Sequence, residues 1–259
     1  MRYHLRMELS VTSFLIVCPI CFLVGIMNAS VGGGGLVSLP AMLLVGLPPH
    51  MAIGTNKLQA ICGLSVATLR YAKSGLLKLR LVVPTVICAV AGSLVGSHFS
   101  LSVSEEILNY IIVLVLPVVA FVVFKKDSFV DGEEKELVLT RRTYVTACAC
   151  SFVIAAYDGF YGPGAGTFYV IALCLVAQLG ARYASSHAKV VNLVTNTAAT
   201  VVFLVNGQVC VPLGLAGGLC GMVGAWLGAG LVIKDGARIM KPLIALAFVL
   251  LLVKLVLGM

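Results

Sequence analysis

The sequence predicts an all-α, polytopic membrane protein made of two inverted-topology repeats. Of its 259 residues, 60% are hydrophobic and only 11% are charged, and the mean hydropathy is +1.09. Soluble domains carry about 25% charged residues, so this chain cannot cover a water-facing surface. Many apolar runs approach the roughly 18–20 residues that span a bilayer, and strand-like alternation is absent, which favours helices over a barrel. A glycine-rich break also occurs twice, in the matching stretches 30–60 and 160–192.

The two stretches indicate an internal duplication. A shift of 132 positions aligns Gly32 with Gly164 and Lys57 with Lys189, and the register holds over more than sixty residues. We therefore divide the chain into a first membrane repeat, 1–124, a cytoplasmic linker, 125–142, and a second membrane repeat, 143–259. The linker is the only sustained polar region, with five basic and five acidic residues.

Each repeat is predicted to hold five helical segments, the second of them short. The segments are 11–27, 36–47, 52–71, 81–99 and 107–124, then 143–157, 167–179, 183–205, 211–233 and 239–257. As a helix, 36–47 reaches only about 18 Å, so it is too short to cross the core unaided. We expect 8–10 membrane segments, depending on whether the short ones cross or re-enter. The first segment resembles a signal peptide but lacks a small-residue cleavage pattern, so we interpret it as a retained helix.

Loop charges predict the orientation of the helices. The net charge is +8, and most Lys and Arg residues lie between apolar runs, in the 72–80 loop, the linker, the 180–189 turn and the 234–241 loop. These loops score as cytoplasmic, whereas the two loops without basic residues score as external. Equivalent helices of the two copies then run in opposite directions. This assignment places both termini outside, against the evidence of Arg2 and Arg6, so the side of the N-terminus stays open.

Several other classes of function are disfavoured. The sequence shows no basic, aromatic-rich face of the kind that binds nucleic acid. Nine cysteines, an odd number scattered through apolar segments, do not form a disulfide framework. Cys18 and Cys21, and likewise Cys148 and Cys150, are interpreted as small core residues, with a redox or metal pair as the alternative. No cofactor and no metal are expected.

The glycine-rich breaks are candidate anion sites. Backbone N–H groups freed at membrane depth are tolerated only where they meet protein, water or a ligand, and the positive end of a short helix favours an anion. Inverted repeats with broken helices are typical of secondary transporters. A tight helix crossing is the alternative reading of the first break. The candidate backbone positions are Gly33, Gly34, Gly35, Gly164 and Gly166.

Two lysines at equivalent positions reinforce this prediction. A lysine inside the membrane costs about 2.5–3.5 kcal/mol on insertion scales, so Lys57 and Lys189 either have a function or extend to the interface. Two ammonium groups with amide and hydroxyl donors would bind a small oxyanion. The candidate donors are Asn56, Gln59, Asn192, Asn196, Thr55 and Thr167.

Asp158 is the only carboxylate at a predicted break, 158–166. It is expected either to pair with a lysine or to carry a proton. His187 could titrate near neutrality, or have no role. With the cell interior negative, moving one anion outward gains about 2.3 kcal/mol per 100 mV, so uncoupled transport is export. Uptake would need a co-transported proton or cation.

Several motifs resemble the TauE/SafE family of sulfite exporters and sulfonate-uptake permeases. They are GGGGLVSLP, AIGTNKLQA, DGFYGPGAGTF and HAKVVN, and the resemblance covers essentially the whole chain. It looks closest to the branch described only as probable membrane transporters. The resemblance implies a multi-pass protein of a bacterial or archaeal plasma membrane that moves sulfite, thiosulfate or organosulfonates. GPGAG in the second copy departs from GGGG in the first, so the two half-sites are not expected to be equivalent.

Two rival functions remain beside anion export and proton-coupled uptake. The chain could be a non-transporting assembly subunit, and the GxxxG pairs Gly92–Gly96 and Gly224–Gly228 could pack within the bundle or form a homodimer contact. An intramembrane enzyme is disfavoured, because the sequence shows no paired carboxylates, His cluster or nucleophile–base pair. The expected partners are therefore a small anion, the lipid bilayer and a second copy of the chain.

Overall fold

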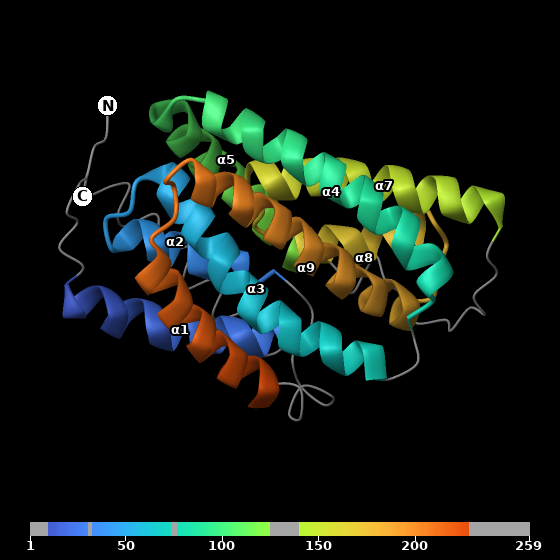
Figure 1. The fold of residues 1–259 in the computed structure, drawn as a ribbon, viewed down its shortest axis with the longest axis horizontal. Helices are drawn as coiled ribbons and strands as arrows, with labels where there is room; N and C mark the ends of the chain where they lie inside the picture. The colour runs from blue at the N-terminus through green and yellow to red at the C-terminus, as the bar shows by residue number, and fades with distance from the viewer. Residues whose placement is uncertain (1–9, 31–32, 74–76, 125–139, 228–259) are drawn as a thin grey trace.

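The fold is described from a computed structural model, which covers residues 10–30, 33–73, 77–124 and 140–227 (Figure 1). Within those ranges the regular structure is helical, with no strand. The helices are α1 (Val11–Ser30), α2 (Gly35–Leu44), α3 (Pro49–Lys73), α4 (Leu79–Ser102), α5 (Glu105–Phe124), α7 (Arg141–Phe160), α8 (Ala165–Leu175) and α9 (Ala181–Val205), followed by the helix Val211–Leu227.

Four of these helices are long and apolar enough to cross a membrane. They are the segments Val11–Asn28, Leu79–Ser102, Arg141–Phe160 and Tyr183–Val205. Large apolar side chains point outward, as lipid requires: Leu114 is 72% exposed and Val205 81%. Lysine, asparagine and threonine side chains are buried inside instead. The predicted class, an all-α polytopic membrane protein, is confirmed.

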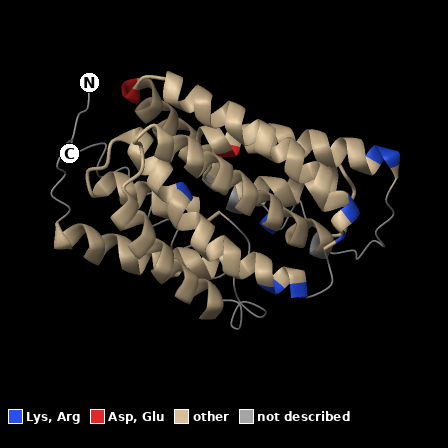
Figure 2. Ribbon diagram, viewed as in Figure 1, with Lys and Arg blue, Asp and Glu red and all other residues tan. Residues whose placement is uncertain are grey.

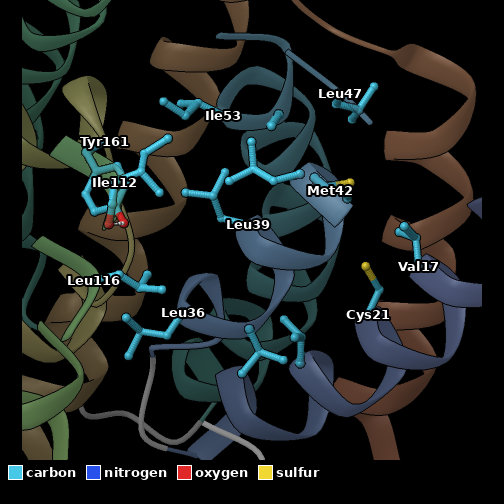
Figure 3. Packing of buried hydrophobic residues seen from close by; sticks show 14 of the residues in the cluster. Val17, Cys21, Leu36, Leu39, Met42, Leu47, Ile53, Ile112, Leu116 and Tyr161 are labelled. Carbon is cyan, nitrogen blue, oxygen red and sulfur yellow. Dashed lines mark hydrogen bonds between the residues drawn. The ribbon is translucent and has the colours of Figure 1, made fainter. Parts of the chain in front are cut away.

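The short helices lie inside the protein. Both α2 and α8 are apolar on all sides, and a helix of that kind must be surrounded by protein or lipid. The core cluster around α2 includes Leu36, Leu39 and Met42, which pack against α1, α5 and Tyr161 (Figure 3). A second cluster forms around Tyr169 and the rest of the buried face of α8. The prediction of one short helix per copy is confirmed, at 10 and 11 residues.

Helices of one copy pack tightly on helices of the other. A side chain at Gly92 of α4 would collide with the main-chain oxygen of Phe152 in α7. A side chain at Gly224 would collide in the same way with the main-chain oxygen of Phe22 in α1. Phe22 and Phe152 are 130 positions apart and the two glycines 132, so these two contacts are equivalent under the duplication. The described GxxxG glycines are thus used within the bundle; Gly228 lies outside the described residues.

The equivalent helices α3 and α9 run antiparallel. Gly54, near the start of α3, contacts Phe203 near the end of α9 and Gln208 just after it, whereas Thr68 near the end of α3 donates to the main-chain oxygen of Lys189 (3.2 Å). Figure 1 shows the two helices side by side with opposite chain direction. The inverted repeat stays a prediction, and these contacts support it.

Basic residues gather at one end of the bundle (Figure 2). Arg70 and Lys73 end α3, Arg80 follows the start of α4, and Arg141 begins α7. The acidic first turn of α5, which holds Glu105, lies at the opposite end. This segregation matches the predicted cytoplasmic and external loops.

Several predicted boundaries are wrong by a few residues. The helix predicted to end at Met27 continues to Ser30 as α1, and the one predicted to end at Tyr157 continues to Phe160 as α7. Asp158 therefore lies in the last turn of a helix, not in the break. Its Asp-Gly sequence is typical of a turn, but the left-handed backbone begins only at Gly162. Residues 125–139 of the predicted linker and the predicted segment 239–257 lie outside the described residues.

Candidate functional site

The two helix breaks meet inside the protein. Left-handed backbone at Gly33 (φ +89°), Gly162 (φ +103°) and Gly164 (φ +81°) turns the chain into the short helices, a conformation that only glycine adopts without strain. At the start of α2, a Cβ on Gly35 would lie 3.2 Å from Cα of Pro163 in the opposite break. The breaks of the two copies are therefore in direct contact.

A polar cavity of about 30 Å³ lies between these breaks. A space of this size holds a few waters. The lining comes from both copies and consists of Asn28, Gly33, Gly35, Asn56, Lys57, Ala60, Leu64, Asp158, Gly162, Gly164, Ala165, Gly166, Asn192 and Asn196. Because α2 and α8 both begin here, their positive ends face the same small volume.

Lys57 and Asp158 form a buried ion pair at the cavity. The Lys57 Nζ lies 2.5 Å from Asp158 Oδ1 and also donates to the main-chain oxygen of Asp158. Only 1% and 2% of the two residues are exposed. Thr195 and Asn196 of α9 donate to the other carboxylate oxygen, Oδ2. Removing a carboxylate from water costs several kcal/mol, and hydrogen bonds to both of its oxygens offset that cost.

Lys189 makes the equivalent contact in the other half. Its Nζ donates to the main-chain oxygen of Asn28 (2.6 Å), and Asn28 aligns with Asp158 under the shift of 130 positions. The Asn28 side-chain oxygen accepts from the N–H of Gly34 (3.0 Å), which fixes the start of α2. Lys57 thus ties α3 to α7, and Lys189 ties α9 to α1.

Asparagine amides complete the polar lining. The Asn196 amide donates to the main-chain oxygen (2.7 Å) and side-chain oxygen (2.8 Å) of Asn192. Ser38 of α2 donates to the side-chain oxygen of Asn56. With its oxygen engaged, the Asn56 amide N–H₂ is the part that can donate to a ligand, and it lies near Gly35.

Other predicted site residues lie away from the cavity. Thr55 accepts from the N–H of Cys210 (2.9 Å), and Gln59 packs against Gly221. His187 bonds Thr85 of α4 (2.8 Å). Thr167 is fully buried, and its hydroxyl makes no hydrogen bond in the described part of the chain. Their roles in binding stay predictions.

Sequence reasoning missed three residues that shape the site. Asn28 lines the cavity, Thr195 holds the Asp158 carboxylate, and Gly162 leaves the room that the Lys57 ammonium occupies. Asn28 could have been found from the first-helix register, since it aligns with Asp158 at 130 positions rather than 132.

These features define a class of protein. A polytopic helical fold with two short helices, buried lysines and a polar cavity between the starts of those helices is typical of membrane transporters. The chain belongs to the sulfite exporter TauE/SafE family, whose model matches residues 17–255. It is a multi-pass membrane protein of a transporter family.

Named relatives agree with this membership. The chain is 33% identical to a probable membrane transporter protein, ORF9, of a Sinorhizobium species, over 90% of this chain and 88% of the relative. It is 29% identical to a probable membrane transporter protein of Haemophilus influenzae, over 96% and 97%. It is 27% identical to the probable membrane transporter protein YfcA of Escherichia coli, over 91% and 87%. These relatives are named as transporters, not enzymes. No solved structure matches the chain significantly.

Proposed function

We propose that this protein is a secondary transporter of small anions that works by alternating access between its two copies. The observation that carries the proposal is the cavity at the joined breaks, where the N-terminal ends of α2 and α8 and the Lys57 ammonium converge. Helix N-termini and ammonium groups both favour negative charge. Among the described residues, the buried lysines and carboxylates around the site are Lys57, Lys189 and Asp158, a sum that also favours an anion.

Movement is part of this proposal. We propose that the site widens to admit its substrate, because the glycine-rich backbone at Gly33 and Gly162 can accommodate a change of shape. Widening toward one membrane face at a time would give alternating access.

The substrate class we propose is sulfur-containing oxyanions or organosulfonates. Its support is the description of the matched family as sulfite exporters. Export is the proposed direction, because an anion leaves a negative interior spontaneously. We further propose that the protein resides in a bacterial or archaeal plasma membrane.

One observation favours a second candidate, proton-coupled uptake. The Asp158 carboxylate lies at the cavity and accepts hydrogen bonds from Lys57, Thr195 and Asn196, so protonation there would change how the two copies are tied together. A residue in that position suits a coupling role.

Flux in proteoliposomes tests both candidates. Purified protein is reconstituted with ³⁵S-labelled sulfite inside, and efflux is followed under an imposed potassium diffusion potential or a pH gradient. Uncoupled export predicts efflux that is accelerated by an inside-negative potential and unaffected by the pH gradient at zero potential. With labelled sulfite supplied outside instead, accumulation driven by a pH gradient would replace export with coupled uptake. Leakage equal to that of protein-free liposomes, for sulfite, thiosulfate and a sulfonate alike, would contradict transport and favour the assembly subunit.

A further inference from the structure

Two pairs of thiols face each other where the copies meet. Cys148 of α7 lies within electrostatic range of Cys88 of α4. Cys18 of α1 lies within the same range of Cys220 of the Val211–Leu227 helix. None of the four is in a disulfide, and all are partly exposed. Each pair joins a helix of the first copy to a helix of the second.

The two pairs are equivalent under the duplication. Cys18 and Cys148 are 130 positions apart, and Cys88 and Cys220 are 132 apart, the same two shifts that relate the surrounding helices. The separate helix-to-helix contacts have thus produced the same juxtaposition of thiols twice. The same juxtaposition at two equivalent places argues against a chance approach of unrelated side chains.

Glycine packing brings the two helix backbones close together beside each pair of thiols. Cys88 lies four residues before Gly92, and Cys148 four residues before Phe152, so the thiols occupy the same face one turn earlier than that backbone contact. The second pair lies one turn before the Gly224–Phe22 contact in the same way. A disulfide needs Cα atoms within about 7 Å, and parallel helices reach that separation only where their backbones nearly touch.

The lipid-facing surroundings indicate which oxidant can reach them. Ile87 and Val145, next to the first pair, are 65% and 62% exposed, and Leu219, next to the second, is 63% exposed. In a membrane these side chains contact acyl chains. A lipid-soluble, two-electron oxidant such as a quinone therefore has access from within the bilayer.

We propose that Cys88–Cys148 and Cys18–Cys220 are paired redox sites that a membrane quinone oxidises to disulfides linking the two copies. Two S–H bonds break and one S–S bond forms at each pair. Two electrons and two protons pass to the quinone, which leaves as quinol. Reduction by a dithiol restores the thiols.

The linkage should be compatible with transport. The Gly92–Phe152 contact beside one pair and the Gly224–Phe22 contact beside the other have the same geometry. If the transport cycle exchanges the conformations of the two copies, each of these contacts is replaced by an identical one and need not change. This consequence rests on the proposed function, whereas disulfide formation does not.

The test oxidises reconstituted full-length protein with decylubiquinone, a fully substituted quinone, and in parallel with copper–phenanthroline. Mass spectrometry of non-reduced peptides should show both linkages, and the Tm should rise by about 5 °C or more over the reduced protein. Cys88→Ser and Cys18→Ser should each remove one linkage. Cys150→Ser, on the same helix as Cys148, and Cys21→Ser, beside the second pair, should keep both.

The outcomes are distinct. Absence of both linked peptides after either oxidant overturns the proposal, and linkage by copper–phenanthroline alone overturns the quinone as oxidant. Linked protein should retain sulfite flux within about twofold; loss of flux that dithiothreitol restores would overturn the claim that these contacts stay fixed. A reduced protein without flux would refute transport while leaving the thiol chemistry intact.

Discussion

Lys57 and Asp158, which belong to opposite copies of the duplication, form a buried ion pair with 2.5 Å between Nζ and Oδ1. At the equivalent place, Lys189 donates to the main-chain oxygen of Asn28, so the first copy carries an amide side chain where the second carries the Asp158 carboxylate. The site is therefore pseudosymmetric in position and asymmetric in charge.

Asp158→Asn should make the two halves chemically alike and leave Lys57 without its counter-charge. Removing one partner of a buried ion pair costs about 3–5 kcal/mol, so we expect a clearly lower Tm. A bound anion can replace the missing charge, and therefore sulfite should raise the Tm of the variant more than that of the wild type. Thermal-shift titration measures both effects. An equal or smaller sulfite shift in the variant would contradict an anion site next to Lys57.

Lys57→Ala and Lys189→Ala should abolish stabilisation by the anion while the protein stays folded. Because Lys57→Ala also leaves Asp158 without its ion-pair partner, the double variant Lys57→Ala/Asp158→Ala is the matched control. It should recover stability relative to the single variant and still fail to respond to sulfite. The readouts are Tm with and without sulfite and monodispersity in detergent. An unchanged sulfite response in both lysine variants would remove the lysines from the site.

Gly162→Ala should weaken transport more than it weakens folding. The backbone at Gly162 has φ +103°, and a Cβ there would collide with the Lys57 ammonium. Gly207→Ala is the control, since Gly207 also has positive φ (+71°) but no atom within 4 Å of the added carbon. Both changes carry a backbone cost of roughly 1–3 kcal/mol. Only Gly162→Ala is expected to lose sulfite flux; equal flux in both variants would mean that the space at Gly162 has no functional role.

Gly92→Leu should separate α4 from α7 and destabilise the fold. The glycine contacts the main-chain oxygen of Phe152, which cannot give way as a flexible side chain would. Overpacking of a tight contact costs about 1–3 kcal/mol or more. Gly63→Ala is a mild comparison in a helix interior, because its added carbon would lie 3.7 Å from the nearest atom. A lower Tm for Gly92→Leu than for Gly63→Ala is expected, and similar values would contradict the close approach of the two copies.

The sequence supported prediction of the membrane class, the short helices and the meeting of Lys57 with the glycine breaks. These features depend on hydrophobic length and on the internal register, which a single sequence contains. The sequence could not show which polar side chains face the cavity. Asn56, Lys57 and Ala60 of α3 line the cavity. Thr55 and Gln59 each precede a lining residue by one position, which is about 100° around the helix, and therefore face the other copy's helices.

The contacts of Asp158 could also be predicted only in part from the sequence. Pairing with a lysine was one expectation, and the structure shows Lys57 in that role. The hydrogen bonds from Thr195 and Asn196 depend on how α9 packs on α7, which no local pattern specifies. Helix ends near the breaks were missed because Asp-Gly is read as a turn, whereas tertiary contacts extend α7 to Phe160.

Locating a bound anion tests the central claim most directly. Selenite is the heavier analogue of sulfite, and its selenium scatters X-rays anomalously, so crystals grown with selenite can show where the anion binds. The account predicts one anomalous peak between the starts of α2 and α8, within contact distance of Lys57, and its loss in Lys57→Ala. An anomalous peak elsewhere in the protein, or none at saturating selenite, would contradict an anion site between the two copies.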